Sequence, residues 1–325
     1  MSIPSAAALD RGPSSSPAAG RGFRFVVLAS LCWGTSGVSG QIVADRTPLG
    51  PLDIAWHRMT IGAVVLLAAH LLTRRRRVER VALSRGTALR LALVGAGLAA
   101  YQVAYFAAVA TAGVSIATLV ALGLAPLLIA LGAALLGHGR PDRATLVALV
   151  SALTGLVLLV GISADAGGTA VVLGALLAVG SALGYAVVTL AGSGVPAGVP
   201  VTVVGFACGA LLLTPAALLT GLTSTTDPFA LGVLLYMGAV PSALAYGLFF
   251  TGLRTVPGAV ASIVTLLEPL TAIALATAFL GERLAPGALV GGLLVLAAVA
   301  GLYLRRMGDS NSRGVAPNPL SKRAP

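Results

Sequence analysis

The sequence predicts an all-α membrane protein with ten transmembrane helices arranged as two inverted five-helix repeats. Three observations predict this fold: an apolar composition, ten apolar segments of membrane-spanning length, and basic residues confined to alternate connections between them. Hydrophobic residues make up 57% of the 325 residues, and the mean hydropathy is +0.98. Charged residues make up 10%, whereas a soluble protein usually carries about a quarter. A water-soluble fold of this length cannot bury so many apolar side chains, so lipid is the expected solvent.

Ten segments have the length and composition of membrane-spanning helices. A helix crosses about 30 Å of hydrocarbon with about 20 mostly apolar residues. Turn and charge signals separate the segments, and the weakest of them, at residues 111–113, separates the third from the fourth. The predicted spans are residues 24–44, 52–72, 88–109, 114–136, 144–161, 171–191, 199–220, 229–250, 258–280 and 286–304.

The tails and the two repeats follow from the same pattern. Residues 1–22 are rich in Ser, Pro, Ala and Gly, and residues 305–325 are mostly polar and contain several prolines, so we expect two disordered cytoplasmic tails. The first five-helix repeat is expected at residues 23–161 and the second at residues 171–304.

Basic residues determine the predicted orientation, because Lys and Arg accumulate on the cytoplasmic side of a membrane. With the N-terminus inside, 18 of the 21 basic residues fall in cytoplasmic segments, Arg46 and Arg283 fall in outer loops, and Arg58 lies within a helix. Both termini are therefore expected in the cytoplasm. Abundant Arg, Ala and Gly with almost no Lys are typical of a GC-rich bacterial genome, so a bacterial plasma membrane is expected. The basic residues lie between apolar runs and not on one face, which argues against a nucleic-acid partner.

The two halves carry similar sequences at an offset of 143 to 144 residues. In the first half GVSIATLV (113–120) precedes APL (125–127), and in the second half PGAVASIV (257–264) precedes EPL (268–270). Because each repeat has an odd number of spans, the second copy is inverted in the membrane. Inverted repeats are common in secondary transporters, whose solute site lies near the middle of the membrane where the repeats meet.

Several short motifs lie within the predicted helices or at their ends. They are Trp33-Gly34, Arg58, the small-residue stretch into Pro126, Tyr185-Ala186, Ala261-Ser262 running to Leu267-Glu268-Pro269, and Gly281-Glu282-Arg283. Together they resemble the EamA-type, ten-helix members of the drug/metabolite transporter superfamily over residues 24–304. The first half departs from that pattern, with Gly137-His138-Gly139-Arg140 in place of Gly-Glu-Arg. The resemblance implies alternating-access transport of an amino acid, a metabolite or an amphiphilic drug through a central cavity.

Glu268 is the only acidic residue predicted near the middle of the membrane. It lies about ten residues, or roughly 15 Å, into the predicted helix 258–280. An ionised carboxylate is costly in hydrocarbon, so we expect it to face the bundle interior. There it either binds a proton, a coupling cation or a substrate amine, or it is a neutral, hydrogen-bonded group that holds helices together.

Arg58 and two prolines each have two interpretations. Arg58 is predicted about 9 Å from the outer end of its helix. It either reaches the membrane interface beside Trp56 or faces inward and attracts an anionic solute group. Pro126 and Pro269 occupy corresponding mid-helix positions, and each removes a backbone hydrogen bond. The paired kinks predict either two gates or simply a bent bundle.

Polar and aromatic side chains at membrane depth are the remaining candidates for a solute cavity. Lipid offers no hydrogen bonds, so such groups either line a cavity or pack between helices. The candidates are Trp33, Ser36, Tyr101, Gln102, Tyr105, Tyr185 and Tyr246. Tyr101 and Tyr105 are four residues apart and therefore share one helix face.

Other functions have little support in the residues. Cys32 and Cys208 lie in separate apolar segments, which fits neither a disulfide framework nor a metal site. No phosphate-binding loop and no converging set of catalytic residues is present, so we predict no metal, no cofactor and no enzymatic activity. A non-transporting membrane scaffold and an intramembrane enzyme are the alternatives to a small-solute carrier. Homo-oligomerisation, the solute, the direction of transport and the choice between proton antiport and facilitated exchange stay open.

Overall fold

The computed structural model describes residues 17–73, 84–137, 143–196, 198–253, 255–256, 261 and 264–314. Every regular element within these residues is helical, and none is a strand. The elements are α1 (Pro17–Gly34), α2 (Ser36–Arg46), α3 (Pro51–Thr73), α4 (Arg85–Leu135), α5 (Arg143–Gly192), α6 (Val201–Leu219), α7 (Pro228–Gly238), a π-helical segment (Ala239–Leu244), α8 (Ala245–Gly252), α10 (Leu267–Leu280) and α11 (Pro286–Gly314).

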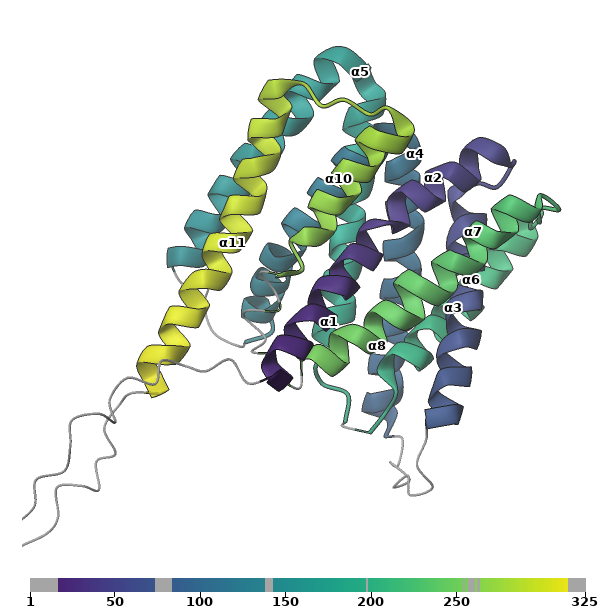
Figure 1. Ribbon diagram of the computed structural model, residues 1–325, viewed down its shortest axis with the longest axis horizontal. Coiled ribbons are helices and arrows are strands. Elements are labelled where there is room, and N and C mark those ends of the chain that lie inside the picture. The colour runs from purple at the N-terminus through teal and green to yellow at the C-terminus, as the bar shows by residue number, and fades with distance from the viewer. Residues whose placement is uncertain are drawn as a thin grey trace, which may run out of the picture.

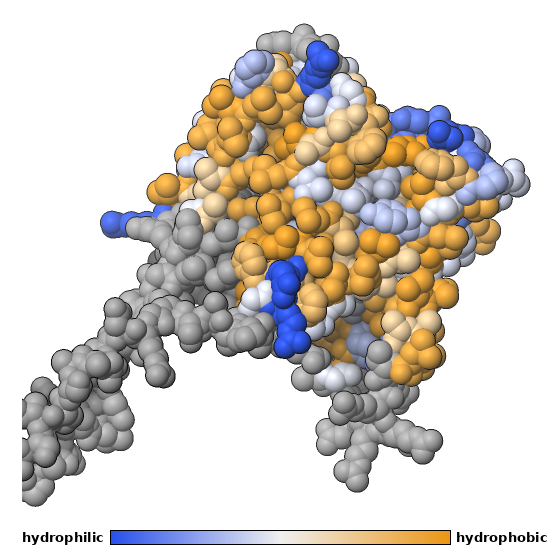
Figure 2. Space-filling model, in the orientation of Figure 1, coloured by the Kyte–Doolittle hydropathy of each residue, from blue (hydrophilic) through white to orange (hydrophobic). Residues whose placement is uncertain are grey.

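The surface of the bundle matches a lipid environment. Within the described residues, seven helical stretches are long and apolar enough to cross a membrane, and two further apolar helices, Leu267–Leu280 and Pro286–Ala298, are shorter. Large apolar side chains such as Leu72 and Leu219 point outwards almost fully exposed. Figure 2 shows a broad apolar band across one face of the bundle, with hydrophilic residues towards its upper and lower ends. Such a surface is stable against lipid tails rather than water.

The two longest elements, α4 and α5, are each two helices joined at a glycine. Gly113 in α4 has φ 83° and Gly168 in α5 has φ 63°, a backbone conformation that side-chain-bearing residues rarely adopt. At Gly113 space is also short, because an added Cβ would lie 2.8 Å from Oε1 of Glu282. Figure 1 shows the chain of α5 turning over at the upper end of the bundle. The breaks predicted at residues 111–113 and between the spans 144–161 and 171–191 are therefore both present.

Helix boundaries differ from the predicted spans in several places. The α1 helix begins at Pro17 and α11 continues to Gly314, so each enters a segment predicted to be a tail. The span predicted at 24–44 is divided at Thr35 into α1 and α2. The differences at the tails have a simple cause: a helix satisfies its own backbone hydrogen bonds and continues past the edge of an apolar run. The remaining tail residues, 1–16 and 315–325, lie outside the described part of the chain.

The helices end at two opposite ends of the bundle (Figure 1). We call the end at which α1 begins the lower end, and α3 and α11 also finish there. The opposite, upper end carries the connection from α2 to α3, the turn within α5 and the connection from α10 to α11. The two ends of the described chain therefore lie at the same end of the bundle.

Close helix packing depends on glycines at several crossings. The α5 and α11 backbones touch where Gly155 faces Gly291: a Cβ on Gly291 would lie 2.6 Å from the Gly155 carbonyl oxygen and 2.6 Å from the Leu159 nitrogen. At another crossing a Cβ on Gly209 would lie 3.0 Å from the Gly95 carbonyl oxygen. Small residues let helix backbones approach in this way, and in lipid such contacts are a main source of helix association.

Replacing Gly291 with Val is expected to lower the stability of the bundle by about 1 to 3 kcal/mol, because the new side chain overlaps backbone atoms that cannot move independently. The melting temperature of the purified protein in detergent measures this loss. Gly232→Val is the matched control, since a Cβ at Gly232 meets nothing within 4 Å. Equal melting temperatures for the two variants would contradict a tight α5–α11 contact.

Candidate functional site

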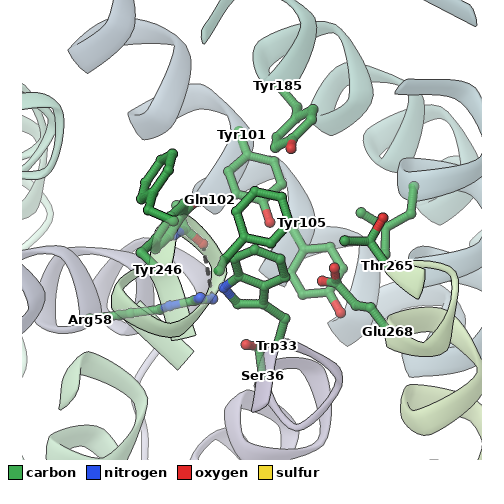
Figure 3. Close-up of a pocket in the computed structure, with 13 residues that line it drawn as sticks. Trp33, Ser36, Arg58, Tyr101, Gln102, Tyr105, Tyr185, Tyr246, Thr265 and Glu268 are labelled. Atoms are coloured by element: carbon green, nitrogen blue, oxygen red, sulfur yellow. Dashed lines mark hydrogen bonds between the residues drawn. The ribbon is translucent and has the colours of Figure 1, made fainter. Parts of the chain in front are cut away.

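A central cavity of about 250 Å³ lies among helices from both halves of the chain (Figure 3). All the residues proposed from the sequence as solute-binding or coupling groups line it: Trp33, Ser36, Arg58, Tyr101, Gln102, Tyr105, Tyr185, Tyr246 and Glu268. They come from α1, α2, α3, α4, α5, α8 and α10. Sequence reasoning missed Leu122, Phe249, Phe250 and Thr265, which also line the cavity. Phe249 and Phe250 follow Tyr246 by three and four residues, so helical spacing was a signal for them.

Arg58 faces the interior of the bundle. Its side chain is 4% exposed, Nη1 donates to Oε1 of Gln102 at 3.2 Å, and Nε donates to Oγ of Ser242 at 3.3 Å. The guanidinium also lies 5.8 Å from the centre of the Phe106 ring. The interpretation that Arg58 reaches the membrane interface is therefore wrong. Partners on α4 and on the π-helical segment hold the side chain inside the bundle.

The π-helical segment positions Ser242 against Arg58. The Ser242 hydroxyl is fully buried, donates to the Met237 carbonyl oxygen at 2.9 Å and accepts from Arg58. The donor and that carbonyl are five residues apart, the spacing of a π-helical turn. Pro241 lies in the same segment and has no backbone N–H to place in the helix. Sequence periodicity gives no signal for this single wide turn, so the contact between Ser242 and Arg58 was not predicted.

The Arg58 guanidinium retains unused donors that can reach a solute. It has five N–H groups, and its side-chain hydrogen bonds within the described residues go to Gln102 and Ser242. No acidic side chain in the described part of the chain forms an ion pair with it. Arg58 therefore offers a fixed positive charge to the cavity.

Glu268 lies on another wall of the same cavity. Figure 3 shows Arg58 and Glu268 reaching in from opposite sides. Glu268 is the second residue of α10, where the partial positive charge of the helix N-terminus favours a carboxylate. The charges of Glu268 and Arg58 interact across the cavity, yet within the described residues the Glu268 carboxylate accepts no hydrogen bond and forms no direct ion pair.

Aromatic rings form much of the remaining wall. Trp33 packs 5.2 Å from Tyr246 and 5.1 Å from Phe249, measured between ring centres. Tyr101 lies 6.3 Å from Tyr105 and 5.7 Å from Tyr185. Tyr101 and Tyr105 share a helix face, as their spacing predicts. The cavity therefore combines two charged groups with apolar, polarisable walls that suit an organic solute.

A second cavity of about 250 Å³ continues from the first towards the lower end. It shares Tyr185, Thr265 and Glu268 with the central cavity and extends to Pro126 and Thr189. Thr189 is three residues from the end of α5, and α5 ends at the lower end of the bundle. The central cavity is therefore continued in the direction of the lower end.

The two prolines border this second cavity in different helical settings. Pro126 lies inside the second half of α4, as predicted. Pro269 instead lies in the first turn of α10, directly after the turn at residues 265–266. A proline is well tolerated there because the N–H groups of the first turn have no partner within the helix. Pro269 therefore follows a turn and does not bend a continuous helix. Most of residues 257–263 lie outside the described part.

At the upper end, hydrogen bonds join the α10–α11 connection to α4. Glu282, in the connection between α10 and α11, accepts hydrogen bonds from the backbone nitrogens of Val114 at 2.6 Å and Ser115 at 2.9 Å. These N–H groups begin the second half of α4, directly after the turn at Gly113. One layer deeper, the Tyr105 and Thr118 hydroxyls form a buried hydrogen bond of 2.8 Å. The corresponding first-half motif, from His138 onwards, lies outside the described residues.

Comparisons with known proteins agree with this architecture. The sequence matches the EamA-like transporter family twice, over residues 20–161 and residues 172–304. It is 31% identical over 283 residues to YwfM of Bacillus subtilis strain 168, a protein named as an uncharacterized transporter; the match covers 84% of this chain and 93% of YwfM. A solved crystal structure of another protein shares the fold with a TM-score of 0.60 and 23% identity, covering 89% of this chain and 99% of that one.

Proposed function

We propose that this chain, which belongs to the EamA-like transporter family, carries a small solute across the bacterial plasma membrane by alternating access. One observation supports the proposal: a central cavity bordered by Arg58 and Glu268 is continued towards the lower end, whereas at the upper end Glu282 joins the α10–α11 connection to α4. Alternating access requires such a site to open to one side of the membrane at a time. Family membership indicates a multi-pass membrane transporter rather than an enzyme.

Ten spans in two inverted five-helix repeats account for the helices. The halves of α4 and of α5 then count as separate spans, and α1 with α2 and α7 with α8 each form one. Support comes from the two ends of the described chain, which lie together at the lower end (Figure 1), as an even number of crossings requires. Arg21, Arg24 and Arg85 lie near helix ends there, whereas Arg46 and Arg283 adjoin upper connections. The lower end is then cytoplasmic, by the positive-inside rule.

Glu268 is the proposed coupling group. Its carboxylate lies in the cavity within membrane depth, where an uncompensated negative charge is costly, so either a proton or a solute cation binds to it. Because the Glu268 carboxylate binds either a proton or the solute cation but not both at once, the carrier exchanges solute for protons. Pro126 and Pro269 border the passage from this site to the lower end and are the proposed gating positions.

Flux into proteoliposomes tests the proposal. Amino acids, nucleosides, sugars and cationic dyes are offered with and without a pH gradient, and empty liposomes serve as the control. We expect saturable flux of one class and a rise in melting temperature with the same class, because a ligand that binds only the folded state stabilises it. A purified, folded chain that moves none of these solutes and is stabilised by none would instead support a membrane scaffold.

A further inference from the structure

We infer that α1 and α8 form one movable wall of the solute passage, and that this wall swings about two adjacent irregular turns to close the lower end. The inference rests on the proposed function, because it names the helices whose movement produces alternating access. The observation behind it is that two neighbouring spans are interrupted close to each other, at Thr35 between α1 and α2 and at the π-helical segment (Ala239–Leu244) between α7 and α8. We call α1 and α8 together the lower wall.

The two interruptions are of opposite kinds and lie side by side. At Thr35 the helix is tightened, because its backbone N–H and its hydroxyl both donate to the Cys32 carbonyl oxygen, three residues earlier, at 3.3 and 2.7 Å. The π-helical segment is widened, with Ser242 bonded to Met237 five residues earlier. Tyr236 of α7 donates to the Thr35 hydroxyl at 2.9 Å, which places the two turns next to each other. Irregular turns of both kinds within a helix are common at hinges and functional sites, and side-chain bonds to the backbone bend helices.

Below these turns, α1 and α8 are packed backbone against backbone. A Cβ on Gly22 would lie 3.0 Å from the Gly252 carbonyl oxygen, and a Cβ on Gly252 would lie 2.8 Å from the Gly22 carbonyl oxygen. Figure 1 shows the two helices side by side at the lower end. Close glycine contacts are a main source of helix association in lipid. The two helices of the lower wall are therefore expected to move as one body.

The lower wall also has a small hydrophobic cluster of its own. Val26 of α1 is fully buried and packs with Val256, Ala261 and Val264, which follow α8 in the chain. This cluster is separate from the main core of the bundle, and Leu267 at the start of α10 packs against it. A unit with its own packing can shift as a whole while the main core stays intact, as hinged domains do.

Each of the two turns touches one charged group of the central cavity. A Cβ on Gly34, the last residue of α1, would lie 2.8 Å from the Glu268 carbonyl oxygen. On the other side, Ser242 in the π-helical segment accepts a hydrogen bond from Arg58. A solute that contacts Arg58 or Glu268 therefore acts next to a turn about which the lower wall moves. Such contacts give the solute a different affinity for the open and closed positions of the wall, which is the requirement for shifting their populations.

Movement of the lower wall changes the width of the passage. The side chains of α1 and α8 that line the central cavity are all aromatic: Trp33, Tyr246, Phe249 and Phe250. The second cavity is bordered by Pro126 of α4 and Thr189 of α5, helices that do not belong to the lower wall. Displacement of the lower wall towards α4 and α5 brings these aromatic rings over the passage and separates the central cavity from the lower end.

Cross-linking within the lower wall and across the passage tests the inference in proteoliposomes. Val26→Cys with Gly252→Cys places both thiols within the wall, at disulfide distance, since a Cβ on Gly252 would lie 2.7 Å from Cγ2 of Val26. Arg24→Cys with Leu136→Cys places one exposed thiol on α1 and one at the end of α4. We expect oxidation of the first pair to leave solute flux within about twofold, and the shortest bismaleimide that joins the second pair to reduce it about tenfold or more.

Both pairs are built with Cys32 and Cys208 replaced by Ala, and each sample is compared with itself before cross-linking. If Gly252→Cys does not fold, Val27→Cys with Leu253→Cys replaces the first pair, because both positions pack against the same cluster. Loss of flux on joining α1 to α8 overturns the single movable wall. Undiminished flux on joining α1 to α4 overturns closure by that wall. A folded protein without any solute flux before cross-linking contradicts the carrier function instead.

The turn at Thr35 is tested by a matched pair of substitutions. Thr35→Val keeps the shape of the side chain and removes both hydroxyl bonds, whereas Tyr236→Phe removes only the bond between the helices. We expect Thr35→Val to lower the maximal flux about threefold to tenfold at an unchanged half-saturating concentration, because a helix without the bond to Cys32 bends less readily. Tyr236→Phe should retain most of the flux. Equal losses in the two variants, or no loss in Thr35→Val, would overturn a hinge at this turn.

Discussion

Replacing Glu268 with Gln should abolish solute accumulation driven by a pH gradient. The substitution keeps the size of the side chain and removes its ability to exchange a proton for a solute cation. A gradient of one pH unit is worth about 1.4 kcal/mol, which supports about tenfold accumulation if one proton is exchanged per solute molecule. In proteoliposomes with a gradient of about one pH unit, we expect the unmodified protein to reach an inside-to-outside solute concentration ratio of about ten. With the variant we expect a ratio of about one.

The remaining activity of this variant is part of the test. At high solute concentration Glu268→Gln should still allow downhill flux, because Arg58 and the aromatic walls are unchanged. Asp45→Asn is the control: Asp45 carries an exposed carboxylate that accepts from Gln41 Nε2 at 2.7 Å, away from the central cavity. It should accumulate solute as the unmodified protein does. Undiminished accumulation by Glu268→Gln would exclude this residue as the coupling group.

The residues of the candidate site could be found from the sequence because the membrane simplifies the problem. Polar groups are costly in hydrocarbon, so a Gln, a Tyr or a Glu at membrane depth is expected to face inward. Depth and polarity together therefore selected Gln102, Tyr185 and Glu268, which all line the cavity. The same rule cannot identify phenylalanines that line the cavity, because apolar side chains such as Phe249 and Phe250 are as stable against lipid as against a solute.

The depth of Arg58 along its helix does not determine which way its side chain points. A long side chain about 9 Å from a helix end can reach either water or the bundle interior. The choice depends on Ser242, which is 184 residues away and is presented by a π-helical turn. Nothing in the local sequence around Arg58 contains that information, so the sequence left both orientations open.

The break before α10 was hidden for a different reason. The apolar run that includes Leu267 and Glu268 was predicted as one helix over 258–280, whereas α10 begins only at Leu267. Inside a membrane protein a turn that is surrounded by other helices needs no polar residues to mark it. Pro269 was the remaining signal, and it fits a first turn as well as a kink. The break places Glu268 at a helix N-terminus beside the cavity.

Replacing Glu282 with Gln should both destabilise the protein and open its upper end. The carboxylate accepts from two backbone N–H groups, at Val114 and Ser115, and a hydrogen bond to a charged group contributes about 1.5 to 3 kcal/mol. A glutamine retains one acceptor oxygen and directs an NH₂ group at the second N–H. We expect a loss of about 2 kcal/mol, seen as a lower melting temperature in detergent. Arg283→Gln, at an exposed position in the same connection, should leave it unchanged.

Labelling from the upper side distinguishes closure of the site from simple capping of the second half of α4. Ser36→Cys, with Cys32 and Cys208 replaced by Ala, places one thiol in the central cavity. A membrane-impermeant thiol reagent added to the upper side should label this cysteine slowly while Glu282 is present. With Glu282→Gln, labelling should be about tenfold faster if loss of the two hydrogen bonds destabilises the closed state by about 1.4 kcal/mol. A lower melting temperature with unchanged labelling would mean that Glu282 only caps a helix. Faster labelling would mean that the contact which completes the fold also keeps the solute site from opening to both sides at once.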